Sequence, residues 1–329
     1  MRTLASIQKI GKLKPIPGAA TIEKATVLGW SVVVKRGEFK IGDLCVYVEI
    51  DSILPNKPEF YFLEKNKFRI KTIRLRGQVS QGICFPLSIL SAGKYSEDQD
   101  ATEMLEIIKY EPPIPAHLAG KAKGPFPSFI PKTDEVRIQS CPQILERYQR
   151  MEFYATEKID GTSMTTFVEN GELNICSRKL CLVKNPGNTF WQVAEKLNLE
   201  GKLKATGEKY ALQGELVGEG IQKNTLKIKG QKYFIFNVYD FAAGRFLDWG
   251  ETKKIVSGWD LEMVPVVTES YFLPKSIDDI VAFATRKSLI NPDSWVEGAV
   301  FRSKTETYDE DLGRLSFKVV NPEFLLTYE

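Results

Sequence analysis

A lysine and an aspartate lie two positions apart in Lys158-Ile159-Asp160-Gly161, near the middle of the 329-residue chain. If a strand leads into this tetrapeptide, Lys158 and Asp160 point to one side, and Glu157 and Ile159 point to the other. Gly161 has no side chain, so a ligand could approach the backbone there. A lysine amine becomes a nucleophile once burial or a nearby cation removes its proton, and a metal ion near Asp160 could be that cation. The plain alternative is a turn with a solvated lysine.

Five later segments carry polar or aromatic residues on otherwise apolar predicted strands. Taken singly, a charged residue in a strand usually lies on the solvated face, and a phenylalanine usually lies in the core. The order and spacing of all five segments after Lys-x-Asp-Gly are much more specific. They are Ser177-Arg178, Glu215, Phe234 to Asn237 with Phe236, Glu297-Gly298 with Val300, and Phe317-Lys318.

With these segments the chain resembles the covalent nucleotidyltransferase superfamily, which contains the ATP-dependent DNA and RNA ligases and the mRNA capping guanylyltransferases. Lys158 to Gly161 match motif I of that family, and the five segments match motifs Ia, III, IIIa, IV and V. The match covers about residues 130 to 325. Within the family the chain most resembles the ATP-dependent RNA ligases that have an N-terminal OB module and no C-terminal domain. A β-rich module precedes motif I here, and the chain ends shortly after Lys318.

This resemblance implies three nucleotidyl-transfer steps. Lys158 attacks the α-phosphate of ATP, forms a lysyl–AMP phosphoramidate and releases pyrophosphate. The AMP then passes to the 5′-phosphate of an RNA or of a nicked strand, and a 3′-hydroxyl attacks to form the phosphodiester. The resemblance leans towards nicks in duplex RNA or RNA/DNA with RNA on the 3′-hydroxyl side.

The resemblance also implies a role for each motif residue. A hydrated Mg²⁺ or Mn²⁺ is expected because Mg²⁺ keeps several of its waters. The implied roles are metal binding through water for Asp160, Glu215 and Glu297, ribose contacts for Glu215 and Arg178, enclosure of the base by Phe236 and Val300, reading of the adenine edge by the backbone at Glu157, and binding of the α-phosphate by Lys318.

Two positions depart from the family pattern. Many members have Lys-x-Lys at motif V, where this chain has Ser316-Phe317-Lys318. We expect Arg314 or a lysine of the N-terminal module to replace the missing cation. Motif IIIa reads Phe-Asn where Phe-Asp is common.

The first third of the chain has the pattern of a small all-β barrel. Short apolar runs at Trp30 to Val34, Leu44 to Ile50 and Ile83 to Phe85 are separated by turn residues, and no long helical period interrupts them. Five to six strands in this length suit an OB-like barrel. Six prolines between 112 and 131 indicate a linker. We therefore expect an OB-like RNA-binding module with its linker at 1–130 and a nucleotidyltransferase domain at 131–329.

A basic stretch in the first module could contact the phosphate backbone of RNA. Its cations alternate with other residues, and one extra residue near Lys71-Thr72 would act as a β-bulge that keeps them on one face. The alternative is an edge strand protected by lysines. The cations are Lys65, Lys67, Arg69, Lys71, Arg74 and Arg76.

The second part of the chain mixes strands with irregularly placed helices, which predicts an α+β class. In fold terms this is an ATP-grasp-like nucleotidyltransferase ligase domain preceded by an all-β OB-like barrel. Glu169-Asn170-Gly171-Glu172 indicates a hairpin turn, and Ser276 with Asp279 resembles a capping box. We expect strands at 152–158, 162–168, 172–177, 209–216, 232–240, 262–268, 295–302 and 314–320, and helices near 142, at 188–199 and at 276–289.

Composition excludes several classes of function. The net charge is only +3, so any basic surface must be local. The five cysteines include no Cys-x-x-Cys pair, so reduced thiols are expected and a zinc site is not. The single histidine, His117, excludes a Ser-His-Asp triad. No apolar run is long enough for a bilayer. We expect an intracellular monomer, cytoplasmic or nuclear, that does not bind membranes.

Three other functions remain open at this stage. A capping-type guanylyltransferase or a DNA ligase would keep the chemistry and change the substrate. A non-catalytic RNA-binding protein with a decayed domain would have no need for Lys158, Glu215, Glu297 and Lys318 together. A tRNA-binding OB protein with an unrelated second domain would explain only the first half.

Overall fold

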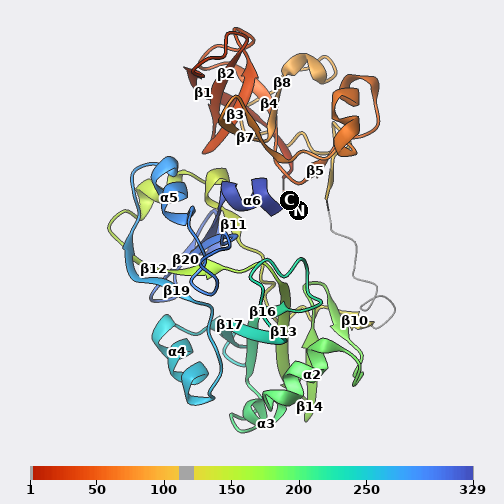
Figure 1. The fold of residues 1–329 in the computed structure, drawn as a ribbon, viewed down its shortest axis with the longest axis vertical. Coiled ribbons are helices and arrows are strands. Elements are labelled where there is room, and N and C mark those ends of the chain that lie inside the picture. The colour runs from red at the N-terminus through yellow and green to blue at the C-terminus, as the bar shows by residue number, and fades with distance from the viewer. Residues whose placement is uncertain (1–2, 111–121, 329) are drawn as a thin grey trace.

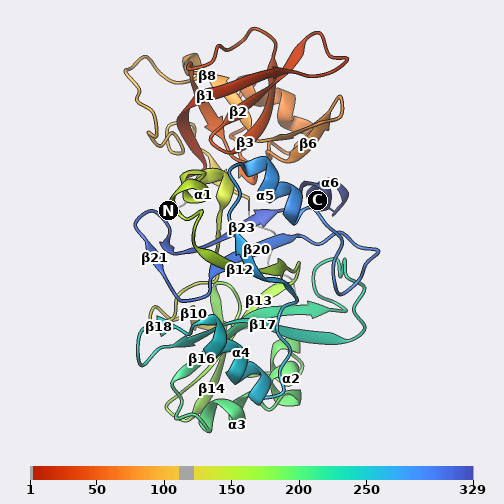
Figure 2. The same ribbon diagram turned by 90° about the vertical axis from the view of Figure 1, so that its left-hand side faces the viewer.

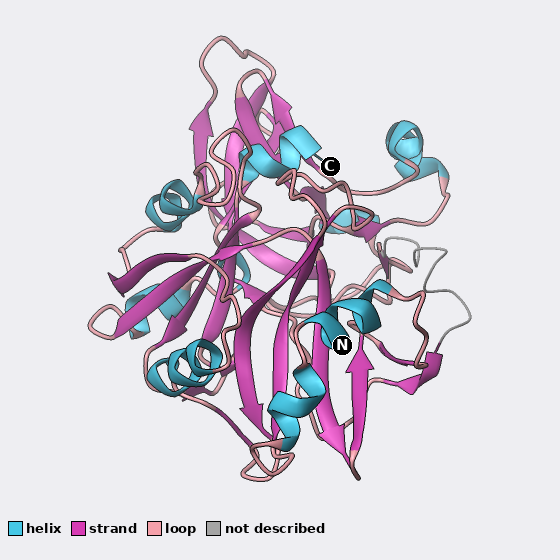
Figure 3. Cartoon of the chain, turned by 60° about the horizontal axis from the view of Figure 1, so that its bottom comes forward, coloured by secondary structure: helices cyan, strands magenta, loops and turns pink. Residues whose placement is uncertain are grey.

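The computed structural model describes residues 3–110 and 122–328, and its regular structure consists mainly of strands (Figures 1 and 3). The N-terminal module lies at one end of the molecule, and two further sheets with their helices form the rest (Figure 1). Much of the predicted linker, including His117, lies outside the described residues. No helix of the described part combines the length and the apolar character that a membrane crossing needs.

The N-terminal module is built on a five-stranded antiparallel sheet in the order β3-β2-β1-β4-β8. The long strand β1 pairs with β4 through its first half and with β2 through its second half. Its register shifts between Ile10 and Lys12, which lets one strand bend into both halves of a barrel. The strands are β1 (Ala5–Pro15), β2 (Ile22–Val27), β3 (Trp30–Lys35), β4 (Leu44–Val48), β5 (Ser52–Ile53), β6 (Thr72–Leu75), β7 (Gln78–Gln81), β8 (Ile83–Pro86) and β9 (Ile108–Lys109), with 3₁₀ helices η1 (Pro58–Asn66) and η2 (Leu87–Ile89).

The prediction that the basic residues between 65 and 76 lie on one continuous strand is wrong. Lys65 lies in η1, and Lys67 ends that helix in the left-handed conformation. Arg69 forms an ion pair with Asp51, and Arg74 forms one with Glu323 near the C-terminus. The chain turns here so that Phe60 and Ile70 are buried in the core, and the alternation of cations in the sequence therefore does not correspond to a strand. Lys71 precedes β6, and Arg76 lies in the turn after it.

The second part of the chain forms a seven-stranded sheet and a five-stranded sheet. Their orders are β10-β15-β14-β13-β16-β17-β18 and β11-β23-β20-β12-β19. The chain passes from one sheet to the other between β12 and β13, so Ile159 to Gly161 bridge the two. The bounds are β10 (Ala122–Pro125), β11 (Val136–Arg137), β12 (Glu152–Lys158), β13 (Thr162–Glu169), β14 (Glu172–Cys176), β15 (Leu180–Leu182), β16 (Tyr210–Gly218), β17 (Gln231–Asp240), β18 (Arg245–Phe246), β19 (Val266–Phe272), β20 (Gly298–Ser303), β21 (Tyr308–Asp309), β22 (Gly313–Arg314) and β23 (Ser316–Val320).

The predicted hairpin and caps are present, whereas several helix bounds differ. Asn170 and Gly171 both have positive φ, as a type I′ turn requires. Asn198 is also left-handed and divides the predicted helix 188–199 into two. The α4 helix was not predicted, although Asp248 and Glu251 form a complete capping box at its start. The helices are η3 (Ile138–Ser140), α1 (Gln143–Arg147), α2 (Thr189–Lys196), α3 (Leu199–Lys204), α4 (Trp249–Gly258), α5 (Ile277–Ala284) and α6 (Pro322–Tyr328).

The C-terminal helix α6 packs into the core of the N-terminal module. Phe324 and Leu325 are 3% and 4% exposed and join the same hydrophobic cluster as Ile7 and Tyr47. Figure 1 shows α6 beside the first module, although the two are separated by most of the chain. This single core fixes the N-terminal module against the rest of the protein.

A glycine contact adds to this docking. A Cβ atom on Gly29, in the β2–β3 turn, would come within 2.9 Å of Gln139 Cα and of Ile277 Cγ1. The Gly29 amide donates to the Gln139 carbonyl oxygen (2.9 Å). Figure 2 shows α1 and α5 directly beneath the first module, where these contacts form.

We expect Phe324→Ala to lower the free energy of unfolding by about 3–5 kcal/mol, because it removes a buried aromatic side chain and leaves a cavity. Denaturant unfolding of the full chain measures this. Thr327→Ala, on the exposed side of the same helix, is the control and should change little. Equal effects of the two substitutions would show that α6 contributes no core packing.

Candidate active site

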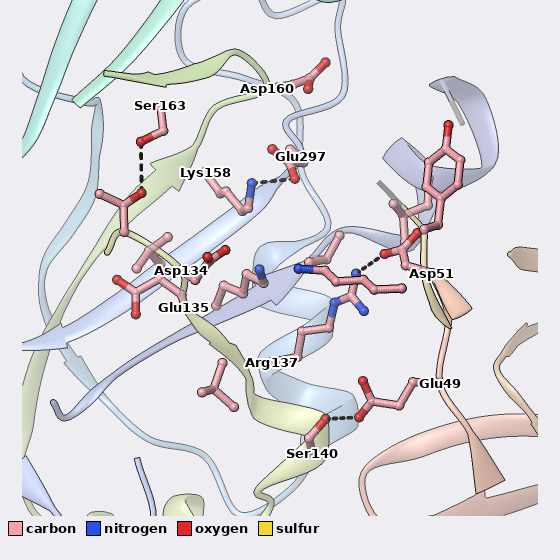
Figure 4. A pocket seen from close by; sticks show the side chains of 18 of the residues that line it. Glu49, Asp51, Asp134, Glu135, Arg137, Ser140, Lys158, Asp160, Ser163 and Glu297 are labelled. Atoms are coloured by element: carbon pink, nitrogen blue, oxygen red, sulfur yellow. Dashed lines mark hydrogen bonds and ion pairs between the residues drawn. The ribbon is translucent and has the colours of Figure 1, made fainter. Parts of the chain in front are cut away.

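A pocket of about 1400 Å³ lies where the two sheets of the second part meet the N-terminal module. Every residue to which the motifs assign a nucleotide or metal role lines it, and Figure 4 shows Asp160 and Glu297 near Lys158. These residues come from β12, β16, β17, β20, β23, the segments beside them and the loop between β14 and β15. They are Glu157, Lys158, Asp160, Arg178, Glu215, Phe236, Glu297, Val300 and Lys318.

The Lys158 amine is surrounded by carboxylates. Its Nζ lies 2.5 Å from Glu297 Oε1 (Figure 4), and the charges of Glu215 and Asp160 also act on it. Burial alone would lower the pKa of Lys158. These carboxylates outweigh that effect and hold the pKa above its ordinary value. The protein by itself therefore keeps the amine protonated and non-nucleophilic.

The pKa of Glu215 is strongly changed by this arrangement. Burial, together with the negative charges of Glu297 and Asp160, raises its pKa to about 8, although Lys158 and the Gly161 amide act in the opposite direction. Even with a proton on Glu215, the carboxylates of Glu297 and Asp160 outweigh the one charge of Lys158, and oxygen ligands of this kind suit Mg²⁺ or Mn²⁺. No group of three potential ligands in the described ranges is close enough to hold a metal ion directly.

Gly161 is needed for the packing of strand β16, and the ligand approach expected at this residue stays a prediction. A Cβ atom there would lie 2.5 Å from the Leu216 carbonyl oxygen and 2.9 Å from Glu215 Cγ. The close neighbour of this backbone is thus strand β16. The missing side chain lets the two sheets come together and brings Glu215 beside Lys158.

Glu157 points away from Lys158, as strand alternation predicts. Its buried carboxylate accepts hydrogen bonds from Ser288 Oγ (2.9 Å) and from the Leu289 amide (2.6 Å). These bonds hold the segment after α5, which explains why that helix ends earlier than predicted. The Glu157 amide already donates to the Pro265 carbonyl oxygen (2.9 Å). A backbone contact from Glu157 to adenine would therefore use the Glu157 carbonyl oxygen.

Arg302 lies in the pocket wall and was not singled out from the sequence. Its side chain is 3% exposed, donates to Glu135 (2.9 Å) and lies 5.7 Å from the centre of the Phe236 ring. Its Nε and Nη1 atoms have no hydrogen-bond partner in the described protein. We infer that it orients Phe236. The sequence could not predict this role, because a charged residue near the end of an apolar strand is usually solvated.

Arg314 does not replace the missing motif V lysine. It donates to Glu306 (2.8 Å) and to Asn237 (2.9 Å) and stacks on Phe246, so it faces away from the pocket. Position 316 is a buried serine. The other predicted replacement, a cation of the N-terminal module, agrees better with the geometry, because Lys71 and Lys109 both line the pocket.

The N-terminal module supplies one wall through a buried ion network. Asp51 binds Arg69 of its own module (2.7 Å) and Arg137 of β11 (2.8 Å). Burial alone would raise the pKa of Asp51, but the two guanidinium groups hold it below its ordinary value. Of the six cations predicted to bind RNA, all within the described residues, only Arg69 and Lys71 line the pocket.

Comparison with known proteins identifies the family. Residues 151–320 match the family model described as RNA ligase, and residues 4–87 match a model described as an OB-fold domain. The chain belongs to the RNA ligase family. This confirms the resemblance seen in the sequence and the α+β ligase domain preceded by an OB-like barrel.

Solved structures of an RNA ligase from Naegleria gruberi are similar to this ligase over nearly the whole chain. An apo variant is 35% identical, with a TM-score of 0.87, over 98% of this chain and 97% of that one. A variant with ATP and Mn is 36% identical, with a TM-score of 0.88, over 98% of both chains. A structure with pyrophosphate is 36% identical, with a TM-score of 0.87, over 99% and 98%. No curated protein matches the chain significantly.

These findings favour an RNA ligase over the capping-enzyme and DNA-ligase alternatives. They also favour it over a non-catalytic RNA-binding protein, because the match covers the motif-bearing domain and the OB module together.

The sequence analysis did not predict the contacts of Asp51, Arg137 and Arg302. Each depends on elements that are far apart in the chain, so no local pattern could have revealed them.

We expect Asp51→Asn to destabilise the ligase by about 3–5 kcal/mol, since two largely buried guanidinium groups lose their counter-charge. Asparagine tolerates the left-handed backbone at this position (φ 67°), so the substitution tests the charge alone. Glu106→Gln is the control, because it removes an exposed ion pair with Lys57 and should cost less than about 1 kcal/mol.

The same pair of variants has a pH signature. The folded-state pKa of Asp51 is lowered, so its stabilisation is complete above the unfolded value of about 4 and is lost as the pH falls through the folded value. Unfolding measured between pH 7 and pH 3 should show the difference between wild type and Asp51→Asn shrinking at low pH. A difference that stays constant would rule out the ionic role of Asp51.

Proposed function

We propose that this ligase seals a 3′-hydroxyl to a 5′-phosphate in RNA through a covalent AMP adduct on Lys158. The observation that carries the proposal is the Lys158 amine, held 2.5 Å from Glu297 within a pocket that both modules line. A reactive amine needs this confinement, because phosphoryl transfer depends mainly on alignment and charge neutralisation.

ATP is the proposed first substrate, as the Naegleria gruberi structures with ATP or AMP and Mn suggest. Lys158 Nζ attacks the α-phosphorus, the bond to the pyrophosphate oxygen breaks, and the amine proton leaves. Lys318, paired with Val300 across β20 and β23, is the cation assigned to the α-phosphate. Phe236 and Val300 enclose the base, and Glu215 and Arg178 contact the ribose.

A divalent cation fits the excess negative charge at Asp160, Glu215 and Glu297. These residues would hold it through its waters, and when bound it supplies positive charge that lowers the pKa of a nearby amine. The residues of the chain then act on a neutral Lys158. Glu297 accepts the hydrogen bond that fixes the amine in place. Glu215, with its pKa raised to about 8, is mostly protonated near neutral pH until the charge of a bound cation lowers that pKa.

The later steps need an RNA surface. The AMP moves from Lys158 to the oxygen of the 5′-phosphate, and the 3′-hydroxyl then displaces AMP from the activated phosphate. Arg69 and Lys71 belong to the N-terminal module and line the pocket, so they are the proposed backbone contacts. Lys65, Lys67, Arg74 and Arg76 keep the RNA-binding role proposed from the sequence, as an outer surface of the module.

The covalent step is tested by intact-protein mass after incubation with ATP and Mg²⁺ or Mn²⁺. We expect a single AMP adduct on the wild type, none on Lys158→Ala, and none with GTP. A chelator should abolish the adduct, because the Lys158 amine then stays protonated. An adduct that persists in Lys158→Ala would refute the assignment of the nucleophile.

The substrate is tested by sealing assays on a nicked RNA duplex, a nicked DNA duplex and single-stranded RNA ends. We expect sealing of nicks with RNA on the 3′-hydroxyl side to be at least about tenfold faster than sealing of single-stranded ends, because a duplex pre-positions both termini. Lys71→Ala should slow sealing more than Lys67→Ala does, as Lys71 lines the pocket and Lys67 does not. Equal rates on all three substrates would contradict nick sealing.

A further inference from the structure

Two thiols face each other in the hairpin that carries Arg178. Cys176, the last residue of β14, is paired in register with Cys181 of β15, and both are free thiols. Each thiol shifts the pKa of the other, as neighbouring groups do. The loop between the strands contains Ser177, Arg178 and Lys179.

The backbone pattern makes this pair suitable for a disulfide. The Ser177 amide donates to the Leu180 carbonyl oxygen (2.8 Å), so these two residues form the hydrogen-bonded pair nearest the turn. The next pair out, Cys176 and Cys181, is then of the non-hydrogen-bonded kind, where Cα atoms lie about 4.5 Å apart and side chains are closest. Disulfides span Cα separations of about 4.4–6.8 Å. Little backbone movement is needed to join the sulfurs.

The two sulfurs have different surroundings, which assigns them different roles. Cys181 is 9% exposed and Cys176 is fully buried. The neighbouring Cys176 thiol and the nearby charge of Lys123 lower the pKa of Cys181, against the effect of burial. Lys123 is anchored on Asn174 Oδ1 (3.1 Å), which lies 3.9 Å from the Cys181 sulfur. Cys181 is therefore the nucleophile of the pair.

We propose that Cys176 and Cys181 form a reversible disulfide when the ligase meets a hydroperoxide. The Cys181 thiolate attacks the O–O bond, becomes a sulfenic acid and releases hydroxide or alkoxide. The Cys176 thiol then attacks the sulfenic sulfur, its proton goes to the departing oxygen, and water leaves. Overall two thiols are oxidised by two electrons, and one hydroperoxide is reduced to water and an alcohol or to two waters.

The disulfide acts on the pocket through Arg178. This residue lines the pocket, forms an ion pair with Asp134 and lies in the short loop between the two cysteines. Joining the sulfurs fixes the two strand ends and restricts the short loop between them, so Arg178 adjusts less freely to a bound nucleotide. The expected loss of ATP affinity rests on the proposed function, because it depends on the ribose contact of Arg178. Formation of the disulfide does not depend on that contact.

Peptide mass mapping of the full-length ligase tests the disulfide directly. Trypsin cleaves after Arg178 and after Lys179, so the cysteines fall on separate peptides, residues 159–178 and 180–184. After hydrogen peroxide treatment and blocking of free thiols, we expect these two peptides as one linked species. It should separate on reduction and be absent in Cys176→Ser and in Cys181→Ser. Absence of the linked species in the wild type would overturn the proposal.

The chain contains its own comparison pair. Cys45 and Cys84 are also buried neighbours, but their partners in register are Pro86 and Tyr47, so they are diagonal to each other. Their sulfurs lie in the core of the N-terminal module. We expect them to stay reduced at peroxide doses that link Cys176 to Cys181. Linking of Cys45 to Cys84 at the same or a lower dose would overturn the argument from register.

The effect on the site is measured by AMP-adduct formation at varied ATP. Oxidation should raise the KM for ATP several-fold with a smaller change in kcat, and dithiothreitol should reverse it. Cys181→Ser should be insensitive to peroxide in the same assay. An oxidised wild type with an unchanged KM would overturn the link to Arg178. Failure of adduct formation even in the reduced protein would instead count against the proposed function and leave the mapping result intact.

Discussion

The structure depends on a set of like charges held around one amine. Lys158 is surrounded by Glu297, Glu215 and Asp160, which come from different strands and from the segments beside them. Burial, together with the charges of Glu297 and Asp160, raises the pKa of Glu215 to about 8. A divalent cation fits this arrangement of carboxylates, and its charge would lower the pKa of the nearby amine.

The position of these groups depends on the way the chain closes on itself. Gly161 lets the two sheets touch at the crossover beside Lys158. Helix α6 then carries Phe324 and Leu325 from the end of the motif V strand into the core of the first module. The OB-like module is thus part of the active-site wall, held by packing and by the Asp51 network. A change at the far end of the chain can therefore alter the pocket without touching a motif.

Much of the site could be predicted because the motif residues lie on strands or directly beside them. Strand alternation correctly separated Lys158 from Glu157, and the strands β12, β13 and β14 match their predicted bounds within one residue. Predictions that relied on local alternation alone were wrong where the core needed turns, as in residues 65–76. Helix α5 was predicted too long because Ser288 and Leu289 bind Glu157, which lies 131 positions earlier in the chain.

By itself the sequence determined the family and the set of residues that line the pocket around Lys158, since spacing along strands preserves motif order. Tertiary structure alone decided that Arg314 leaves the pocket, that Arg302 and Arg137 enter it, and that Asp51 joins the modules. It also placed Cys176 opposite Cys181 across a two-stranded turn. The physical reason is that ion pairing and register depend on distances between elements, and no local pattern of residues encodes those distances.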